Sequence, residues 1–184
     1  MRRFLFILTF VASPSFADCP AAPDIASELD ALIIQAREAP DDQAAGNISN
    51  DMWQLWLKAP DAAAQEVLDR GMRQRASYDY IGAVETFDEL IDYCPAYAEG
   101  YNKRAFIYFL TGEFEKSLAD LDRALELSPK HVGAQSGRAL TLMNLGRLSE
   151  ARLQLLAALE NNPWLSERFL MAKGGPLAAD AEEI

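Results

Sequence analysis

Residues 101–129 read YNKRAFIYFLTGEFEKSLADLDRALELSP, and this stretch decides the fold. Apolar residues recur at helical spacing on both sides of Gly112, and Pro129 ends the second run, so the stretch predicts a helix, a tight turn and a second helix. The same landmarks recur 34 residues upstream and downstream. The matching positions are Gly71, Ala105 and Ala139; Ala83, Ser117 and Ala151; Phe87, Leu121 and Leu155; Leu90, Ala124 and Ala158; and Pro95, Pro129 and Pro163.

A helix-turn-helix unit with this period resembles the tetratricopeptide repeat (TPR) family. The family signature of aromatic, small, tyrosine, alanine, aromatic and proline positions is matched by Tyr101, Ala105, Tyr108, Ser117, Leu121 and Pro129. The resemblance covers about residues 61–172. It implies an all-α fold, an alpha-alpha superhelix (TPR solenoid) of antiparallel helix pairs, and a role in binding another protein.

The register places three repeats in residues 61–163, at about 64–97, 98–131 and 132–165. We expect their helices at 62–76 and 80–93, at 97–110 and 114–127, and at 131–144 and 148–161. Small residues on facing helices, such as Ala105 and Ser117, let the two helices of a repeat approach, and stacking buries the remaining apolar faces.

The C-terminal segment is expected to close this stack. A capping segment at 164–172, with a helix from Ser166 to Ala172 and Ser166 as its cap, would cover the apolar edge of the last repeat. Residues 173–184 contain two glycines, a proline and three acidic residues, so we expect a disordered tail.

Residues 18–60 are expected to form an N-terminal helical hairpin. Asp24 is a candidate cap for a helix over 25–39, and Asn50 or Asp51 for a short helix over 52–59, with the polar stretch 41–50 as the loop between them. Two interpretations stay open: a degenerate fourth repeat, or an unrelated hairpin that caps the solenoid.

The chain begins with MRR, followed by the apolar run FLFILTFVA and then SPSFA. A charged start, a short apolar core and small residues at Ser15 and Ala17 are typical of a secretory signal peptide. We expect residues 1–17 to be removed, because the apolar run is shorter than the roughly 20 residues that span a bilayer. We expect no membrane span after cleavage and an exported protein, in the periplasm if the source is a Gram-negative bacterium.

The formal net charge is −11, and removal of the two arginines in residues 1–17 makes it −13. A chain this acidic is repelled by phosphate backbones and by anionic lipids, so nucleic acid is not an expected partner.

The chain has two cysteines, Cys19 and Cys94. In an oxidising compartment we favour one disulfide between them, which would tie the mature N-terminus to the end of a repeat. The alternative is two free thiols, with Cys94 as a small core residue.

Arginine stands just before the small first-helix residue of each repeat, at Arg70, Arg104 and Arg138. One interpretation is an anion-binding ladder. The other, which we favour, is a structural pair between each arginine and the second helix of its own repeat, above all a partly buried Arg104–Asp120 pair. The residues available on those second helices are Thr86, Asp120 and Gln154.

The resemblance also implies a concave face lined by the first helix of each repeat. Its centre is apolar and its rim polar, which suits a peptide or a partner helix. The alternative is that the hairpin or the acidic tail covers this face. The predicted partner-binding positions are Met72, Arg75, Glu99, Asn102, Phe106, Phe109, Ser136, Leu140, Met143 and Asn144.

The family's clamp of lysines and asparagines for a C-terminal carboxylate is not matched by this sequence. The relevant places hold Leu68, Asp69, Met72, Asn102, Lys103 and Phe106. We therefore do not predict that ligand.

The sequence offers little support for an enzyme. Its one histidine, His131, stands at a helix start, where solvent exposure or a local hydrogen bond is the ordinary explanation, and no glycine-rich phosphate loop or CxxC motif occurs. We expect no catalytic residues, no metal site and no cofactor. The predicted function is a non-enzymatic adaptor of the cell envelope; the alternatives are a self-associating structural subunit without a separate client, or a binder of a small envelope ligand. The oligomeric state and the client are not predicted.

Overall fold

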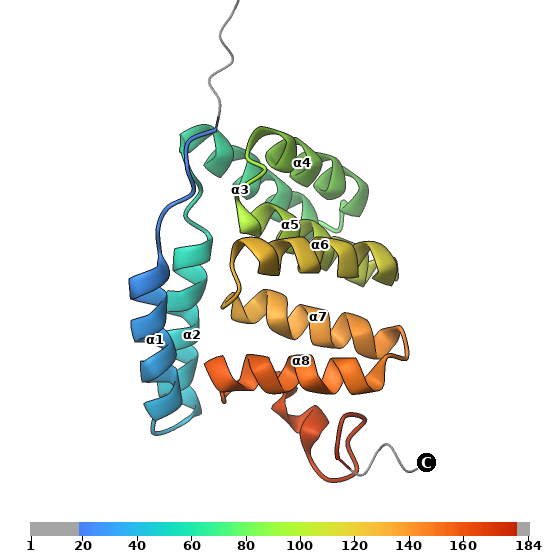
Figure 1. The fold of residues 1–184 in the computed structure, drawn as a ribbon. Coiled ribbons are helices and arrows are strands. Elements are labelled where there is room, and N and C mark those ends of the chain that lie inside the picture. Colours follow the sequence, from blue (N-terminus) through green and yellow to red (C-terminus); the bar gives the residue numbers. More distant parts are fainter. Residues whose placement is uncertain (1–18, 180–184) are drawn as a thin grey trace, which may run out of the picture.

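Three pairs of antiparallel helices are stacked along residues 62–161 (Figure 1). The computed structural model describes residues 19–179. The expected all-α superhelix of helix pairs is confirmed, and each of these helices begins and ends within one residue of its predicted bounds. The helices are α3 (Ala62–Ala76), α4 (Tyr80–Tyr93), α5 (Ala98–Leu110), α6 (Phe114–Leu127), α7 (Val132–Asn144) and α8 (Leu148–Asn161).

Small side chains lie where the helices of a repeat cross. Ala83, Ala105 and Ser117 are completely buried. Ser117 also lies 3.2 Å from the hydroxyl oxygen of Thr141 on the next repeat, so a polar contact joins α6 to α7 inside the stack. Large apolar side chains such as Phe87 fill the space beside these crossings. A bulkier residue at a crossing would overpack it, at a cost of about 1–3 kcal/mol.

The N-terminal hairpin consists of α1 (Ala26–Glu38) and α2 (Asp42–Trp56). The prediction of a loop at 41–50 was wrong, because α2 begins at Asp42 and the Asp41 carboxylate caps it by accepting from the Ala44 amide at 2.8 Å. In the early part of α2, Ala45 is buried and Ile48 packs against the apolar cluster that includes Leu29 and Ile33 of α1, and this burial outweighs the polar composition of the stretch.

The hairpin lies beside the stack, with α1 and α2 running across the direction of the repeat helices (Figure 1). A fourth repeat would place α2 against α3, whereas here α1 contacts α8 at the far end of the stack. The Arg37 side chain, for example, donates to the Glu160 carbonyl at 2.5 Å. The hairpin therefore braces the repeats from the side rather than extending them.

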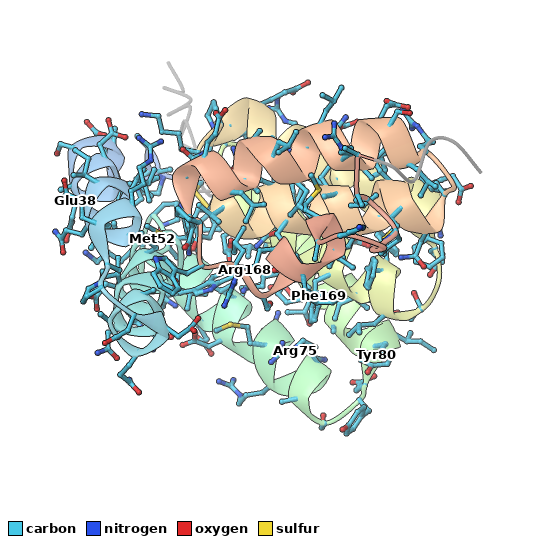
Figure 2. The ribbon with its side chains drawn as sticks, turned by 90° about the horizontal axis from the view of Figure 1, so that it is seen from below. Glu38, Met52, Arg75, Tyr80, Arg168 and Phe169 are labelled. Atoms are coloured by element: carbon cyan, nitrogen blue, oxygen red, sulfur yellow. A yellow bond between two sulfur atoms is a disulfide. The ribbon has the colours of Figure 1, made fainter. Side chains whose placement is uncertain are left out.

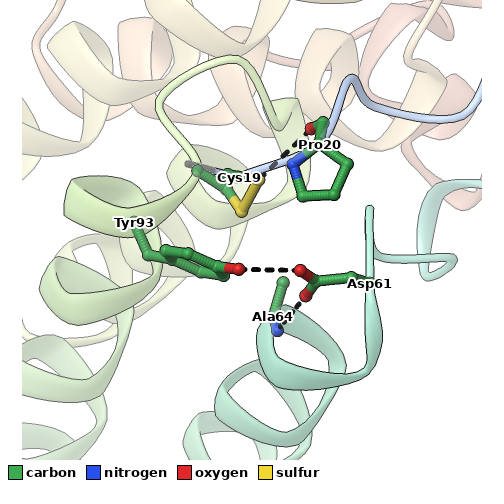
Figure 3. Close-up of a disulfide and its surroundings, with 6 residues drawn as sticks. Cys19, Pro20, Asp61, Ala64 and Tyr93 are labelled. Carbon is green, nitrogen blue, oxygen red and sulfur yellow. Dashed lines mark hydrogen bonds between the residues drawn. A yellow bond between two sulfur atoms is a disulfide. The ribbon is translucent and has the colours of Figure 1, made fainter. Parts of the chain in front are cut away.

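A disulfide joins Cys19 to Cys94, at the end of α4 (Figure 3). Beside it, the Tyr93 hydroxyl donates to the Asp61 carboxylate at 2.7 Å, and the same carboxylate caps α3 through the Ala64 amide at 2.8 Å. The Ala64 amide, followed by Tyr93, lowers the pKa of Asp61. Both ends of the hairpin are thus anchored at the first repeat: one by the disulfide, the other by the start of α3.

The segment after α8 differs from its prediction in two ways. A 3-10 helix, η1 (Ser166–Met171), replaces the expected helix, and Ser166 does not cap it, because its hydroxyl donates to Glu167 instead. Residues 173–179 are not disordered as predicted: Leu177 is buried and donates its amide to the Leu170 carbonyl at 3.0 Å. Leu170 and Leu177 cover the apolar edge of α7 and α8, so burial outweighs the flexible composition.

The predicted signal peptide and the residues from 180 onward lie outside the described residues. Within residues 19–179, no helix combines the length and the apolar character that crossing a bilayer requires.

Candidate functional site

The hairpin packs along one equivalent position from each repeat: Tyr97, His131 and Leu165, which are 34 residues apart. The Tyr97 hydroxyl donates to the Trp56 carbonyl at 2.7 Å, and the His131 ring stacks on the Trp56 indole with centroids 4.1 Å apart. Leu165 packs against the apolar core of the hairpin. We call this contact the hairpin seam. It forms one wall of the concave face.

A buried charge cluster lies at the centre of the seam. The Nε2 atom of His131 is 2.7 Å from the carboxylate of Glu99, and both side chains are almost completely buried. His131 Nδ1 accepts from the Ala134 amide at 3.2 Å and so caps α7. Because Nδ1 is an acceptor, the proton of the neutral ring is on Nε2, which donates to Glu99. The Lys103 ammonium completes the cluster, 2.8 Å from the other Glu99 oxygen.

Burial by itself would raise the pKa of the Glu99 carboxyl. The Lys103 charge and the His131 hydrogen bond together outweigh that effect and lower the pKa to about 2. Glu99 is therefore ionised at neutral pH and holds Lys103 on α5 and His131 at the start of α7 together. The sequence placed Glu99 on the concave face and predicted only exposure or a local hydrogen bond for His131. Glu99 and His131 are 32 positions apart, and no sequence pattern indicates that they meet each other and a tryptophan of the hairpin.

The concave groove encloses about 510 Å³. Its floor comes from the first helices of the repeats, including Arg75 on α3, Phe106 and Phe109 on α5, and Leu140 on α7. Phe106 is 42% exposed. Trp53 and Leu57 of the hairpin form one wall, and Leu165, Ser166 and Glu167 form the end beyond α7.

Gly133 lets the hairpin approach the groove. A Cβ atom at Gly133 would lie 2.5 Å from the Trp53 ring, so any larger residue would push Trp53 away from α7. On its other side Trp53 faces the Lys103 ammonium, 4.5 Å from the ring centroid, in a cation–π contact. The hairpin therefore narrows the groove but leaves it open.

Two polar groups stand in the apolar floor of the groove. Asn102 donates to Glu99 at 2.9 Å and so connects the groove to the buried charge cluster. Ser136 is buried, and its hydroxyl has no hydrogen-bond partner among residues 19–179. An unpaired buried hydroxyl costs free energy.

The structure divides the predicted groove residues into two sets. Those that line the groove are Arg75, Asn102, Phe106, Phe109, Ser136 and Leu140. The other four do not line it. Glu99 is buried in the seam, Met72 packs against the core of the first repeat, and Met143 packs against the core covered by the C-terminal segment. Asn144 is exposed and donates to the Leu140 carbonyl at 2.9 Å.

Sequence reasoning missed the walls of the groove, because they come from outside the repeats. Trp53, Leu57 and Leu165 belong to segments whose placement depends on the seam. No repeat register could have located them, although a tryptophan pair in an amphipathic helix is a signal of burial against a partner surface.

The three arginines of the register occupy structural positions. Arg104 donates to both Asp120 oxygens, at 2.7 and 2.6 Å, and also to Asp88 of the preceding repeat at 2.6 Å. The hydrogen bonds to Asp120 contribute most to raising the pKa of Arg104. The guanidinium thus joins three helices.

Arg138 repeats this arrangement, donating to Gln154 at 3.0 Å and to Asp122 at 2.6 Å. Arg70 does not reach Thr86; it pairs with Glu89, and the Thr86 hydroxyl bonds to Gln74 at 2.7 Å. Arg70 differs because no repeat precedes it to supply the acid that Asp88 and Asp122 supply to the others. Since all three arginines have carboxylate partners, they do not form a free anion-binding ladder.

His131 and Glu99 form a close acid–base pair, and both side chains are almost completely buried beside Trp56. Residues 19–179 contain no group of three or more His, Cys, Asp or Glu side chains placed to hold a metal ion.

Comparison with known proteins matches residues 98–131, which include the stretch 101–129, to the tetratricopeptide repeat. The chain therefore contains a tetratricopeptide repeat. A TPR repeat-containing protein of Rhizobium etli is 31% identical over 121 residues, which are 64% of this chain and 58% of that protein. A tetratricopeptide repeat protein 36 homolog of Nematostella vectensis is 37% identical over 76 residues, 41% of each chain. The chain thus spans about half the length of these relatives.

Solved TPR structures share the fold. The first TPR of Spaghetti (RPAP3), bound to the HSP90 peptide SRMEEVD, superimposes with a TM-score of 0.58 at 22% identity, covering 60% of this chain and 88% of that one. The TPR2B domain of yeast Sti1 in complex with pHsp70 gives 0.55 at 24% identity, covering 62% and 90%. Similarity at this level shows the fold of the TPR segment and nothing about its partners.

Proposed function

We propose that this TPR protein is a non-enzymatic adaptor that binds a peptide or a helix of a partner protein in its concave groove. The observation that carries the proposal is the open groove of about 510 Å³ beside Trp53, a volume within the roughly 300–1,000 Å³ of binding sites. Phe106 is exposed on the apolar floor of the groove. A partner that covers Phe106 removes apolar surface from water, which lowers the free energy.

The chemistry of the groove suits a polypeptide segment. Phe106, Phe109 and Leu140 offer contacts for apolar side chains, while Arg75 and Asn102 supply polar groups in the groove lining. The Spaghetti and Sti1 domains of the same fold were solved with peptides, which makes a peptide the first class of partner to test. A terminal-carboxylate clamp is not part of this proposal, because Leu68 is buried and Met72 packs into the core.

Photocrosslinking tests the proposal. A photoreactive phenylalanine analogue at position 106 should capture a partner from a native extract, and the same analogue at Leu153, which is 65% exposed on α8 outside the groove, should not. The captured protein, once purified, should bind wild type and the Leu153→Glu variant equally and Phe106→Glu at least tenfold more weakly. Equal binding to all three proteins would show that the partner binds outside the groove.

Self-association is the alternative, and exposed Leu153 and Leu156 on α8 favour it. Light scattering during size exclusion separates the two proposals. A concentration-dependent dimer that Leu153→Glu abolishes would support the structural subunit, and a monomer at all concentrations would count against it.

We further propose that the protein acts outside the cytoplasm, in the cell envelope. The Cys19–Cys94 disulfide supports this, since such bonds persist mainly in oxidising compartments, and the signal-like sequence at residues 1–17 agrees with it. Mass spectrometry of the protein from fractionated cells tests the proposal. An envelope form beginning at Asp18 is expected, and a cytoplasmic form with an intact N-terminus would contradict it.

A further inference from the structure

Trp53, in the hairpin wall of the groove, is held between two helices of the repeats. The Lys103 ammonium of α5 lies over its indole, 4.5 Å from the ring centroid. On α7, a Cβ atom at Gly133 would lie 2.5 Å from the Trp53 ring, so the ring edge lies against the backbone of that helix. In Figure 2 the hairpin, marked by Met52, lies to one side of the repeats, and Arg75 marks the α3 part of the groove. The hairpin wall is therefore restrained on two sides.

The Lys103 side chain is itself held in place by Glu99. Its ammonium lies 2.8 Å from the Glu99 carboxylate, one helical turn earlier on α5, and Glu99 is almost completely buried. Lysine has a flexible four-carbon stem, and an ammonium without a partner turns toward water. The Lys103 side chain is only 15% exposed, so the cation stays over the ring. The contact between Lys103 and Trp53 thus depends on a buried acid that does not line the groove.

The repeats do not need this charge pair in order to fold. At the equivalent positions, the first repeat has a hydrogen-bonded pair and the third repeat has two glycines. These residues are Gln65 and Asp69, with the Gln65 Nε2 donating to Asp69 at 3.1 Å, and Gly133 and Gly137. Glycine within a helix costs about 1 kcal/mol relative to alanine, so the third repeat gives up helix stability where it makes room for Trp53. Among the three repeats, the acid and base occur together on the helix whose lysine meets Trp53.

We infer that Trp53 determines which polypeptide segments the groove accepts, and that Lys103, held by Glu99, is its positioning residue. This inference rests on the proposed function. A ring restrained by a cation on one face and by a helix backbone at its edge keeps its place when a partner enters the groove. Because such preorganisation lowers the ordering cost of binding, it favours segments that fit the groove as it stands. The groove is thus selective for segments that fit between Trp53 and the floor at Phe106.

Fluorine NMR of the protein labelled with 5-fluorotryptophan tests the positioning without any partner. The chain has three tryptophans, and replacing each by phenylalanine assigns its signal. The difference in chemical shift between H2O and D2O reports how exposed each ring is. In Lys103→Met this difference should increase for Trp53, because the ring is released, and should stay the same for Trp164 of the C-terminal segment. Lys103→Arg, which keeps a cation over the ring, should restore the wild-type value.

Lys116→Met is the matched control. Lys116 also pairs with a glutamate, Glu113, and also lies over an aromatic ring, Tyr108, at 5.2 Å from its centroid. This variant loses the same kind of contact at a distance from the hairpin wall, so the Trp53 signal should not change. An unchanged exposure of Trp53 in Lys103→Met, or an equal change in Lys116→Met, would overturn the positioning role.

Selection from a phage-displayed library of random 12-residue peptides tests the role of Trp53 in selectivity. Wild type and Trp53→Ala should enrich different sequences, because the wall of the groove is removed in the variant. Synthetic copies of the wild-type peptides should bind Lys103→Met about tenfold more weakly in fluorescence anisotropy and Lys103→Arg within about twofold of wild type. Circular dichroism at the temperature of the assay confirms that each variant is folded. The same sequences enriched on wild type and on Trp53→Ala would overturn the inference.

The groove and its wall fail separately in this design. Peptides that no longer bind Phe106→Glu but bind wild type and Trp53→Ala equally would leave the proposed function standing without a role for Trp53. Peptides that also bind Phe106→Glu as they bind wild type, or no enriched peptides, would overturn both.

Discussion

The hairpin seam is built around a buried charge cluster, whereas the repeats are joined to one another by arginines that remain partly exposed. In the seam, Glu99 and His131 are almost completely buried. In the stack, Arg104 lies between Asp120, whose side chain is 9% exposed, and Asp88, whose side chain is 48% exposed. Breaking a buried pair leaves an uncompensated charge, while an exposed pair is replaced by water at little cost. The two regions should therefore respond very differently to loss of one charge.

The largest effect is expected at the covalent end of the hairpin. The Cys19–Cys94 bridge closes a loop of 75 residues. Its removal in Cys19→Ala/Cys94→Ala should lower the free energy of unfolding by about 4 kcal/mol, mainly because the unfolded chain gains freedom. Urea denaturation measures the change. Wild type in reducing agent should match the variant, and a loss below about 1 kcal/mol would show that packing alone holds the hairpin in place.

Glu99→Gln should have the next largest effect, about 3 kcal/mol, because it leaves the Lys103 charge without its partner inside the seam. Glu113→Gln is the matched control, since Glu113 pairs with Lys116 on the surface, and it should change stability far less than Glu99→Gln does. Equal losses in the two variants would mean that burial does not distinguish the seam from the surface.

The Glu99 cluster also predicts a pH dependence. Its carboxyl has a folded-state pKa lowered from 4.5 to about 2, so the folded state stabilises the ionised form. This contribution is fully present above pH 4.5 and is lost as the pH falls from there toward 2. Urea midpoints over that range should therefore fall more steeply for wild type than for Glu99→Gln. Parallel curves would assign the acid sensitivity to other carboxyl groups.

A smaller effect is expected at the joints between repeats. Arg104→Leu should cost about 2 kcal/mol, because Asp120 stays mostly buried without its donor. Arg138→Leu should cost about 1 kcal/mol or less, since its partners are half-exposed Asp122 and uncharged Gln154. Thermal melts of the two variants side by side check the order. A larger loss of stability in Arg138→Leu than in Arg104→Leu would show that burial of the acidic partner does not determine how much these arginines stabilise the fold.

The arginines also show which contacts the 34-residue register can predict. The register located Asp120 and Gln154 on the second helices, and the structure places both within hydrogen-bond distance of their arginines. It also contained a signal that was missed, since Asp88 and Asp122 are 34 residues apart and each meets the arginine of the following repeat. Partners related by the repeat are thus readable in principle from one sequence.

The groove contains residues that the repeat register does not predict correctly. Met143 has the spacing of an inward residue, yet it packs, partly buried, against the core that the C-terminal segment covers. Trp53 has no place in the repeat register, yet Gly133 makes room for it at the groove wall. Helical spacing says which face a residue is on, but not which other segment of the chain will cover that face.

The sequence by itself determined the six repeat helices and the type of fold, because their periodicity, small crossing residues and prolines act locally or at a constant interval. Only the tertiary structure decided where the hairpin lies and which concave residues stay open. The seam depends on Tyr97, His131 and Leu165, which share a position but no chemical type, and on Trp56 from a distant helix. Burial against a segment outside the repeats is a property of the packed chain, and no local pattern encodes it.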